Sequence, residues 1–147
     1  MTKKSWVKVF AAAAAVVILG YGCFSSFQNQ VGVAATAAKC PVKGLPVAAK
    51  DISFFLPGAF GPNECYEFTI DEAGFREWVS QRRARDPDIG PIEESGFSLL
   101  RYDVEAERFE VISVTSGLVS QWKRGDQGLD YGYDRGAQKA YFHYHSR

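Results

Sequence analysis

An uncharged apolar stretch near the N-terminus constrains this chain more than any other feature of its sequence. Residues 9–27 are nineteen residues without a charged side chain. An apolar α-helix needs about 20 residues to cross a hydrocarbon core of roughly 30 Å, so the stretch is just long enough for one membrane span. Lys3, Lys4 and Lys8 precede it, and no charged residue follows until Lys39. The positive-inside rule therefore places the N-terminus in the cytoplasm and the remaining chain outside the cell membrane.

The same pattern is also typical of a secretory signal peptide, which ends in small residues at a cleavage site. Residues 33–35 and 35–37 supply such small residues. The apolar stretch is longer than the usual apolar region of about 7–15 residues, which favours an uncleaved anchor over cleavage and release. In a third alternative Cys23 carries a lipid, but of the three residues before it only Gly22 matches the bacterial lipoprotein pattern, so we interpret Cys23 as a small apolar residue. The alanine-rich leader suggests a bacterial protein.

Chain length and charge constrain the part of the protein beyond the anchor. Removing the first 38 of the 147 residues leaves 109, the size of one small domain. Of the 17 basic residues, 14 remain against 17 acidic ones, so the exported part carries a net charge of about −3. A nucleic-acid partner requires a basic surface, as does docking on anionic lipid. We therefore expect no nucleic-acid binding, membrane attachment through the N-terminal helix alone, and a protein partner in the cell envelope.

Cys40 and Cys65 are the two cysteines outside the apolar stretch. In an oxidising compartment such a pair is more often a disulfide than a metal or redox site. A loop of about 25 residues would then contribute on the order of 3 kcal/mol. Two-cysteine catalysts usually have the C-x-x-C spacing, which is absent here. The sequence therefore predicts a Cys40–Cys65 disulfide.

The N-terminal half of the exported part predicts a tether, two strands and a helix. Residues 28–50 are rich in Ala, Val and Gly without periodicity, which indicates a tether. Residues 52–56 form an apolar run, and residues 64–70 alternate between apolar and polar side chains, so both segments are expected to be strands. A capping box at residues 69–72, with Asp71 as an alternative N-cap, starts a helix that ends before Pro87. Its buried face carries Phe75, Trp78 and Val79.

The C-terminal half predicts an antiparallel meander of about five strands. Short strands are expected at residues 97–103, 108–115, 117–124, 129–134 and 139–145, separated by polar or glycine-containing turns. The fold class is therefore α+β, with one helix covering a face of the sheet, in a single domain over residues 51–147. Aromatic residues are expected to fill much of the core. The side chains expected to be buried are Phe68, Phe75, Trp78 and Trp122.

Few residues suggest a metal-binding or ligand-binding site. His143 and His145 lie two apart on an expected strand and so share a face, as a metal-binding H-x-H pair requires. A zinc site would need carboxylates from neighbouring strands, such as Asp130, Asp134 or Glu110. The simpler interpretation is a pair of polar residues on the solvent face, and we expect no cofactor. Tyrosines and a tryptophan could also form a stacking platform, although cross-strand pairing explains them equally well; these residues are Trp122, Tyr131, Tyr133, Tyr141 and Tyr144.

Together these patterns favour a non-enzymatic module that is anchored in the membrane and faces the envelope. It would present its sheet, or an apolar loop at residues 52–60, to a protein partner. The sequence contains no G-x-S-x-G, P-loop or G-x-G-x-x-G motif. The alternative is a small metal-dependent or hydrolytic enzyme that uses the strand face of His143 and His145.

Overall fold

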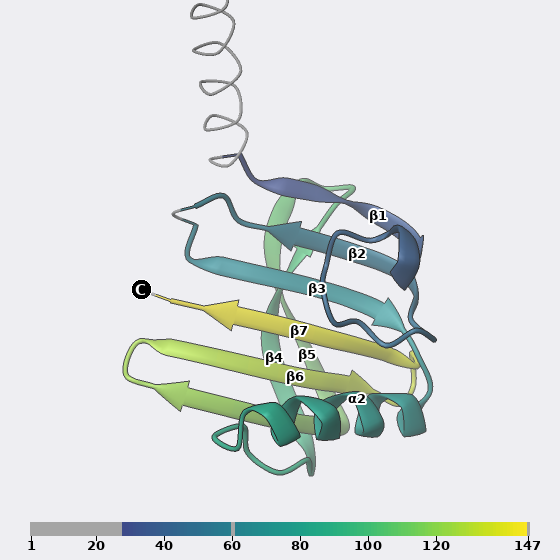
Figure 1. Cartoon of the computed structure of the whole chain (residues 1–147), viewed down its shortest axis with the longest axis vertical. Helices are drawn as coiled ribbons and strands as arrows, with labels where there is room; N and C mark the ends of the chain where they lie inside the picture. Colours follow the sequence, from purple (N-terminus) through teal and green to yellow (C-terminus); the bar gives the residue numbers. More distant parts are fainter. Residues whose placement is uncertain (1–27, 60, 147) are drawn as a thin grey trace, which may run out of the picture.

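Seven antiparallel strands in the order β1-β2-β3-β7-β6-β5-β4 form the sheet of the computed structural model, which describes residues 28–59 and 61–146 (Figure 1). The strands after the helix form a meander, and β7 then pairs with β3. The predicted α+β class, an antiparallel sheet with one α-helix, is confirmed. The elements are β1 Gln30–Thr36, η1 Ala37–Lys39, β2 Lys50–Leu56, β3 Asn63–Thr69, α2 Glu72–Arg85, β4 Glu93–Asp103, β5 Arg108–Arg124, β6 Gln127–Asp134 and β7 Lys139–His145.

The predicted membrane segment, residues 9–27, lies outside the described residues, as do its flanking lysines and Cys23. Within the described ranges, no helix combines the length and apolar character needed to cross a bilayer.

Local sequence chemistry determines where α2 begins and ends. The Asp71 carboxylate accepts a hydrogen bond from the Gly74 backbone N–H at 2.8 Å, as an N-cap residue does. The helix ends at Arg85, because Asp86 precedes a proline and adopts an extended conformation. Phe75, Trp78 and Val79 are buried, as their spacing predicts.

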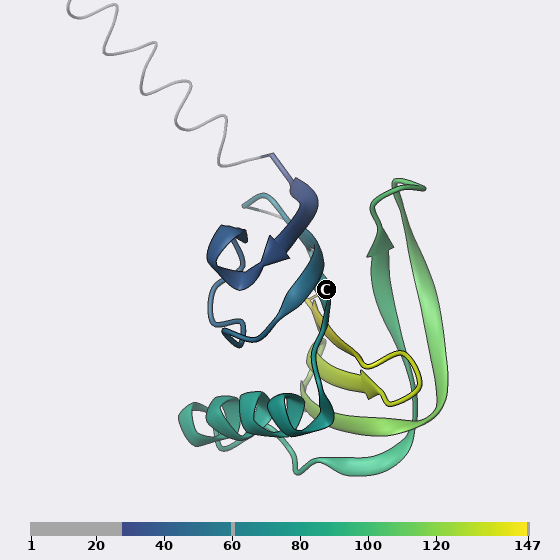
Figure 2. The same ribbon diagram turned by 90° about the vertical axis from the view of Figure 1, so that its right-hand side faces the viewer.

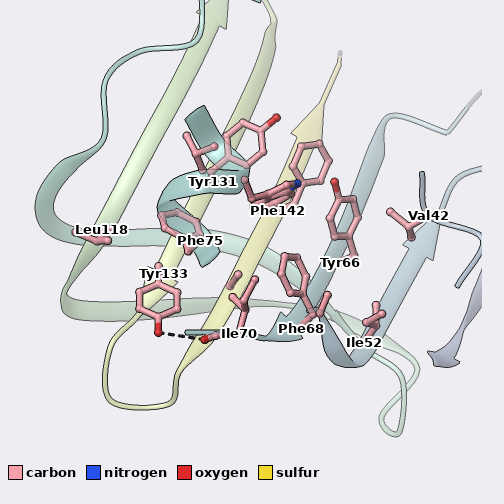
Figure 3. Close-up of a cluster of buried hydrophobic side chains, with 14 of the residues drawn as sticks. Val42, Ile52, Tyr66, Phe68, Ile70, Phe75, Leu118, Tyr131, Tyr133 and Phe142 are labelled. Carbon is pink, nitrogen blue, oxygen red and sulfur yellow. Dashed lines mark hydrogen bonds between the residues drawn. The ribbon is translucent and has the colours of Figure 1, made fainter. Parts of the chain in front are cut away.

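The main core lies between one face of the sheet and a cover made of α2 and residues 40–49 (Figure 3). Phe68 and Phe75 are completely buried and Trp78 nearly so, as predicted, whereas Trp122 is only partly buried. The Trp78 indole N–H donates to the Gly44 carbonyl at 3.0 Å and joins the two parts of the cover. Figure 3 also shows the buried Tyr133 hydroxyl donating to the Ile70 carbonyl.

Two predicted segments differ from the structure. Residues 30–36, expected in the tether, form β1 and pair with β2 in a continuous antiparallel register. Residues 108–124, expected to be two strands, form the single long strand β5, so four strands rather than five follow the helix. Gly117 bends β5 instead of ending it, and a side chain at this position would collide with the Tyr133 carbonyl. A register shift between Ser95 and Phe97 of β4 accompanies the bend.

Beyond this bend, β4 and β5 continue as a hairpin that curls over the sheet face opposite α2. We call residues 97–114 the distal hairpin. Figure 2 shows it rising on the side of the sheet away from the helix. A second, smaller core fills part of the space beneath it and contains Phe97, Leu99, Val119 and Tyr141. The sheet therefore has two covered faces, one under the helix and one under the distal hairpin.

Candidate functional site

The distal hairpin and the opposing strands enclose an open cleft of about 250 Å³, which we call the hairpin cleft. The charged side chains of Glu67, Arg101 and Asp103 face it. Val33 of β1 forms part of its rim and is 72% exposed. The complete lining is Val33, Ser53, Glu67, Arg101, Tyr102, Asp103, Val104 and Glu105.

The charges beside the cleft are paired with one another. Glu67, whose side chain is 8% exposed, accepts hydrogen bonds from Arg101 at 3.1 Å and from Lys139 at 2.8 Å. Arg101 also donates to Glu110 on the neighbouring strand at 2.6 Å. Hydrogen bonds from the Ala106 and Glu105 backbone N–H groups hold the pKa of Asp103 below its ordinary value. This network fastens the distal hairpin to β3 and β7.

Aromatic packing supports the same attachment. The rings of Phe55 on β2, Tyr102 on β4 and Phe109 on β5 lie with pairwise centroid distances of 4.8 to 5.0 Å. The Tyr102 backbone also lowers the pKa of the Cys65 thiol and so opposes the effect of its burial. The end of the distal hairpin is therefore held by both apolar and polar contacts.

A row of polar side chains crosses the sheet beneath the distal hairpin. Cys65, His143 and Asp130 are direct cross-strand neighbours on β3, β7 and β6, so their side chains share one face. Nδ1 of His143 lies 3.6 Å from Oδ2 of Asp130, whose carboxylate accepts a hydrogen bond from Gln121 at 2.7 Å. The sequence spacing gives no sign of this Cys–His–Asp order, because its members come from three separate strands.

The row does not form an activated thiol. Burial raises the pKa of Cys65 to about 12, so the thiol stays protonated near neutral pH. The His143 side chain is 10% exposed, and neither ring nitrogen has a hydrogen-bond partner among the described residues. These groups contribute to a buried face of the sheet rather than to an accessible nucleophile.

The predicted metal pair lies on β7, as expected, with the rings of His143 and His145 5.3 Å apart between centroids. Of the three carboxylates suggested as further ligands, Asp130 lies beside His143, whereas Glu110 and Asp134 are held elsewhere. Glu110 binds Arg101 on the distal hairpin, and Asp134 accepts hydrogen bonds from the Gly136 and Ala137 backbone. Within residues 28–59 and 61–146, no three His, Cys, Asp or Glu side chains form a group that could hold a metal ion.

The predicted Cys40–Cys65 disulfide is not found, and both cysteines are free thiols. Cys65 belongs to the face under the distal hairpin. Cys40 packs against the core on the opposite face, beneath the helix. The sheet thus separates two residues whose sequence spacing alone was compatible with a bond.

The predicted aromatic platform and apolar loop are also absent as exposed surfaces in the described part of the chain. Tyr131 and Tyr133 are buried in the core under α2, whereas Tyr141 lies in the core on the other face. Residues 52–56 lie in β2, which confirms the predicted strand, and Ile52 is completely buried, so this part of the segment 52–60 does not present an exposed apolar loop. Period-two alternation divides both sets between the two faces of the sheet.

The feature that sequence reasoning missed is the open edge of the sheet at β1. Among residues 28–59 and 61–146, this strand pairs with β2 on one side, has no strand on its other side, and ends the strand order. It contains no charged residue and no proline, and its register with β2 has no shift. Val31 and Val33 on the distal-hairpin face are 42% and 72% exposed. The Asn29 side chain accepts a hydrogen bond from the Gly58 N–H at 2.9 Å and fixes the point at which the strand begins.

Comparison of the chain with protein-family models, curated proteins and solved structures gives no match. The geometry of the chain itself is therefore the basis for a functional proposal.

Proposed function

We propose that this protein is a membrane-anchored, extracytoplasmic interaction module that binds another protein by adding a strand to the β1 edge. In this mode an extended segment forms main-chain hydrogen bonds with an open sheet edge, and exposed side chains provide specificity. The observation that carries the proposal is the uncharged and unshifted β1 strand, with Val33 72% exposed beside the hairpin cleft.

The rarity of such edges supports this function. Natural sheets usually protect an edge with charges, prolines, bulges or a covering segment, because an open edge pairs with other chains. Strand β1 carries none of the first three, since its sequence is QVGVAAT and its register is regular. An edge left in this state is well suited to a partner strand.

The position of β1 also supports an anchor that is retained. The two candidate cleavage sites, residues 33–35 and 35–37, fall within β1 and at the start of η1. Cleavage at either site would remove most of a strand that pairs with β2. The strand begins at Gln30, three residues after the apolar stretch, so an uncleaved anchor would hold this edge close to the membrane surface.

Site-specific photo-crosslinking in native membranes tests the proposal. A photoreactive amino acid replaces Val31 in the full-length chain, and a matched chain carries it at Val111, an exposed valine of the distal hairpin. We expect a discrete protein adduct from position 31 and little from position 111. Adding Val33→Lys should abolish the adduct, because a charge on the strand opposes pairing.

Equal labelling at positions 31 and 111 would contradict the proposal, as would an adduct that survives Val33→Lys. Mass spectrometry of the adduct would identify the captured segment.

A further inference from the structure

We infer that the strand bound at the β1 edge is the β1 strand of a second copy of this chain, in an antiparallel pair centred on Val33. This inference rests on the function proposed above and names its partner. The pair would have two-fold symmetry, so the same surface of each copy would meet its counterpart. The two seven-stranded sheets would then form one continuous sheet with both α2 helices on the same side.

The sequence of β1 is complementary to itself in this register. Val33 is the middle residue of the strand Gln30–Thr36, so antiparallel pairing about it aligns the strands over their full length. Polar residues then meet at both ends, small residues meet inside them, and a β-branched pair meets at the centre, which favours cross-strand packing. The pairs are Gln30 with Thr36, Val31 with Ala35, Gly32 with Ala34, and Val33 with Val33.

The charge and the shape of the β1 edge also favour a second copy of this chain as the occupant. No like charges meet along the pair, because β1 has no ionisable side chain. A shallow hollow of about 330 Å³ borders the strand beside Ala35 and Ser53. Val31 of the second copy would lie opposite Ala35 and next to this hollow, so a larger side chain meets a smaller one. Pairing would also cover Val33, the more exposed of the two β1 valines.

The proposed membrane anchor would strengthen a dimer interface that is small by itself. Pairing along one seven-residue edge buries less than the roughly 1,200 Å² that stable complexes usually bury. Two chains held in one membrane have a high effective concentration, which strengthens a weak contact. The dimer is therefore expected in membranes and should weaken when the chain is diluted in detergent.

Cysteine crosslinking of the full-length chain in membranes tests the register. Cys23 and Cys40 are replaced by alanine, while Cys65 is kept because it is 1% exposed. Residues that face each other in an antiparallel pair have Cα atoms about 4.5–5.5 Å apart, within the range for a disulfide. With a mild oxidant, Val33→Cys should form at least tenfold more disulfide-linked dimer than the matched control Val111→Cys.

A second pair of variants separates this register from random collision. Val31→Cys and Ala35→Cys should each give little dimer alone, because four residues of offset separate identical positions by about 13 Å along the strands. Co-expression of the two variants should give a mixed dimer at least fivefold above either alone. Equal crosslinking at positions 33 and 111, or strong crosslinking of position 31 to itself, would overturn the inference.

The failure of this inference can be told from failure of the proposed function. If Val33→Cys gives no dimer while the photoreactive residue at position 31 captures a different protein, self-pairing is wrong and the function stands. If neither experiment gives a product, both are wrong.

Discussion

The two edge strands of this sheet, β4 and β1, differ in their charge, in the regularity of their register and in their attachment to the rest of the domain. Strand β4 carries charged residues at both ends, has a register shift near Gly96, and is attached to the sheet face through Arg101. Strand β1 has no charge and no register shift, and pairs with β2 over its length. Both strands present one side without a strand partner in the described part of the chain.

The difference shows which edge the fold protects. Charges and bulges hinder the docking of another strand, so β4 has the features of an edge that stays unpaired. Its charges also form internal contacts: Glu94 binds Arg135, and Arg101 binds Glu67. The edge at β1 lacks such features within a domain that otherwise has them. Substitutions at each edge can test this contrast, beginning with the largest expected effect.

The attachment of the distal hairpin depends most strongly on neutralising the negative charge of the Glu67 carboxylate. Replacing both Arg101 and Lys139 by methionine leaves this 8% exposed side chain without either cation. An uncompensated buried charge typically costs about 3–5 kcal/mol, so we expect a loss of that size in the free energy of unfolding at pH 7. Urea denaturation of the full chain measures it.

Adding Glu67→Gln to that double variant is the control, because the amide has nearly the same shape and no charge. It should recover most of the lost stability. A triple variant no more stable than the double would mean that the packing of the two long side chains, not the carboxylate, accounts for the loss.

Arg101→Met alone should loosen the distal hairpin without unfolding the domain. Lys139 still neutralises Glu67, so we expect a cost of about 1.5–3 kcal/mol, typical of lost hydrogen bonds to charged groups. Cys65, which is buried on the face under the distal hairpin, should become accessible as the hairpin opens. Alkylation of Cys65 at pH 8, located by peptide mass, should be about tenfold faster than in the wild type.

Arg108→Met provides a matched control, since Arg108 is an exposed arginine on the same hairpin. It should leave the alkylation rate unchanged. Similar acceleration in both variants would show that Arg101 has no special role in holding the β4 edge.

The same contrast explains which parts of the fold could be predicted from the sequence. Strand β3 and helix α2 are encoded by patterns within a few residues, the alternation at residues 64–70 and the Asp71 cap. Strand β1 has no such pattern, because Gly32 and the alanines after Val33 give no alternation, and its pairing with β2 is a tertiary contact.

The candidate site is less predictable still. The neighbours Cys65, His143 and Asp130 come from three strands, and their order depends on β7 lying between β3 and β6. The sequence pattern around Gly117 indicates a boundary between two strands, although this glycine marks the bend that carries the distal hairpin over the sheet. Residue types predict the elements, whereas strand order and curvature determine which side chains meet.

The hydrogen-exchange protection of the first residues of β4 should fall in acid, whereas that of β1 should change less. Hydrogen bonds from Arg135 and Arg76 lower the pKa of Glu72 to about 2, and Arg135 also lowers the pKa of Glu94. A carboxylate with a depressed folded-state pKa stabilises the fold above its unfolded value near 4.5, and this contribution is lost as the pH falls toward about 2. Acidification through this range should therefore lower the hydrogen-exchange protection of residues 93–95 more than that of residues 30–36.

Arg135→Met should remove much of this pH dependence. The difference in urea midpoint between the wild type and the variant should be largest near pH 7 and should shrink as the pH falls below 4.5. Arg85→Met, at the exposed end of α2, is the control and should leave the pH profile unchanged. A difference that stays constant between pH 7 and pH 2.5 would contradict the assignment.

The smallest expected effect is also the most informative about β1. Val33→Lys introduces a charge at a side chain that is 72% exposed, so the free energy of unfolding should change by less than about 0.5 kcal/mol. Val111→Lys, at 68% exposure, should behave alike in urea denaturation. If β1 served only the fold, Val33→Lys would have no further effect. Because we propose that β1 binds a partner, the variant should also eliminate the adduct captured at position 31. If it instead destabilised the domain by more than about 1 kcal/mol, Val33 would act in the fold, and the contrast between the two edges would lose its functional meaning.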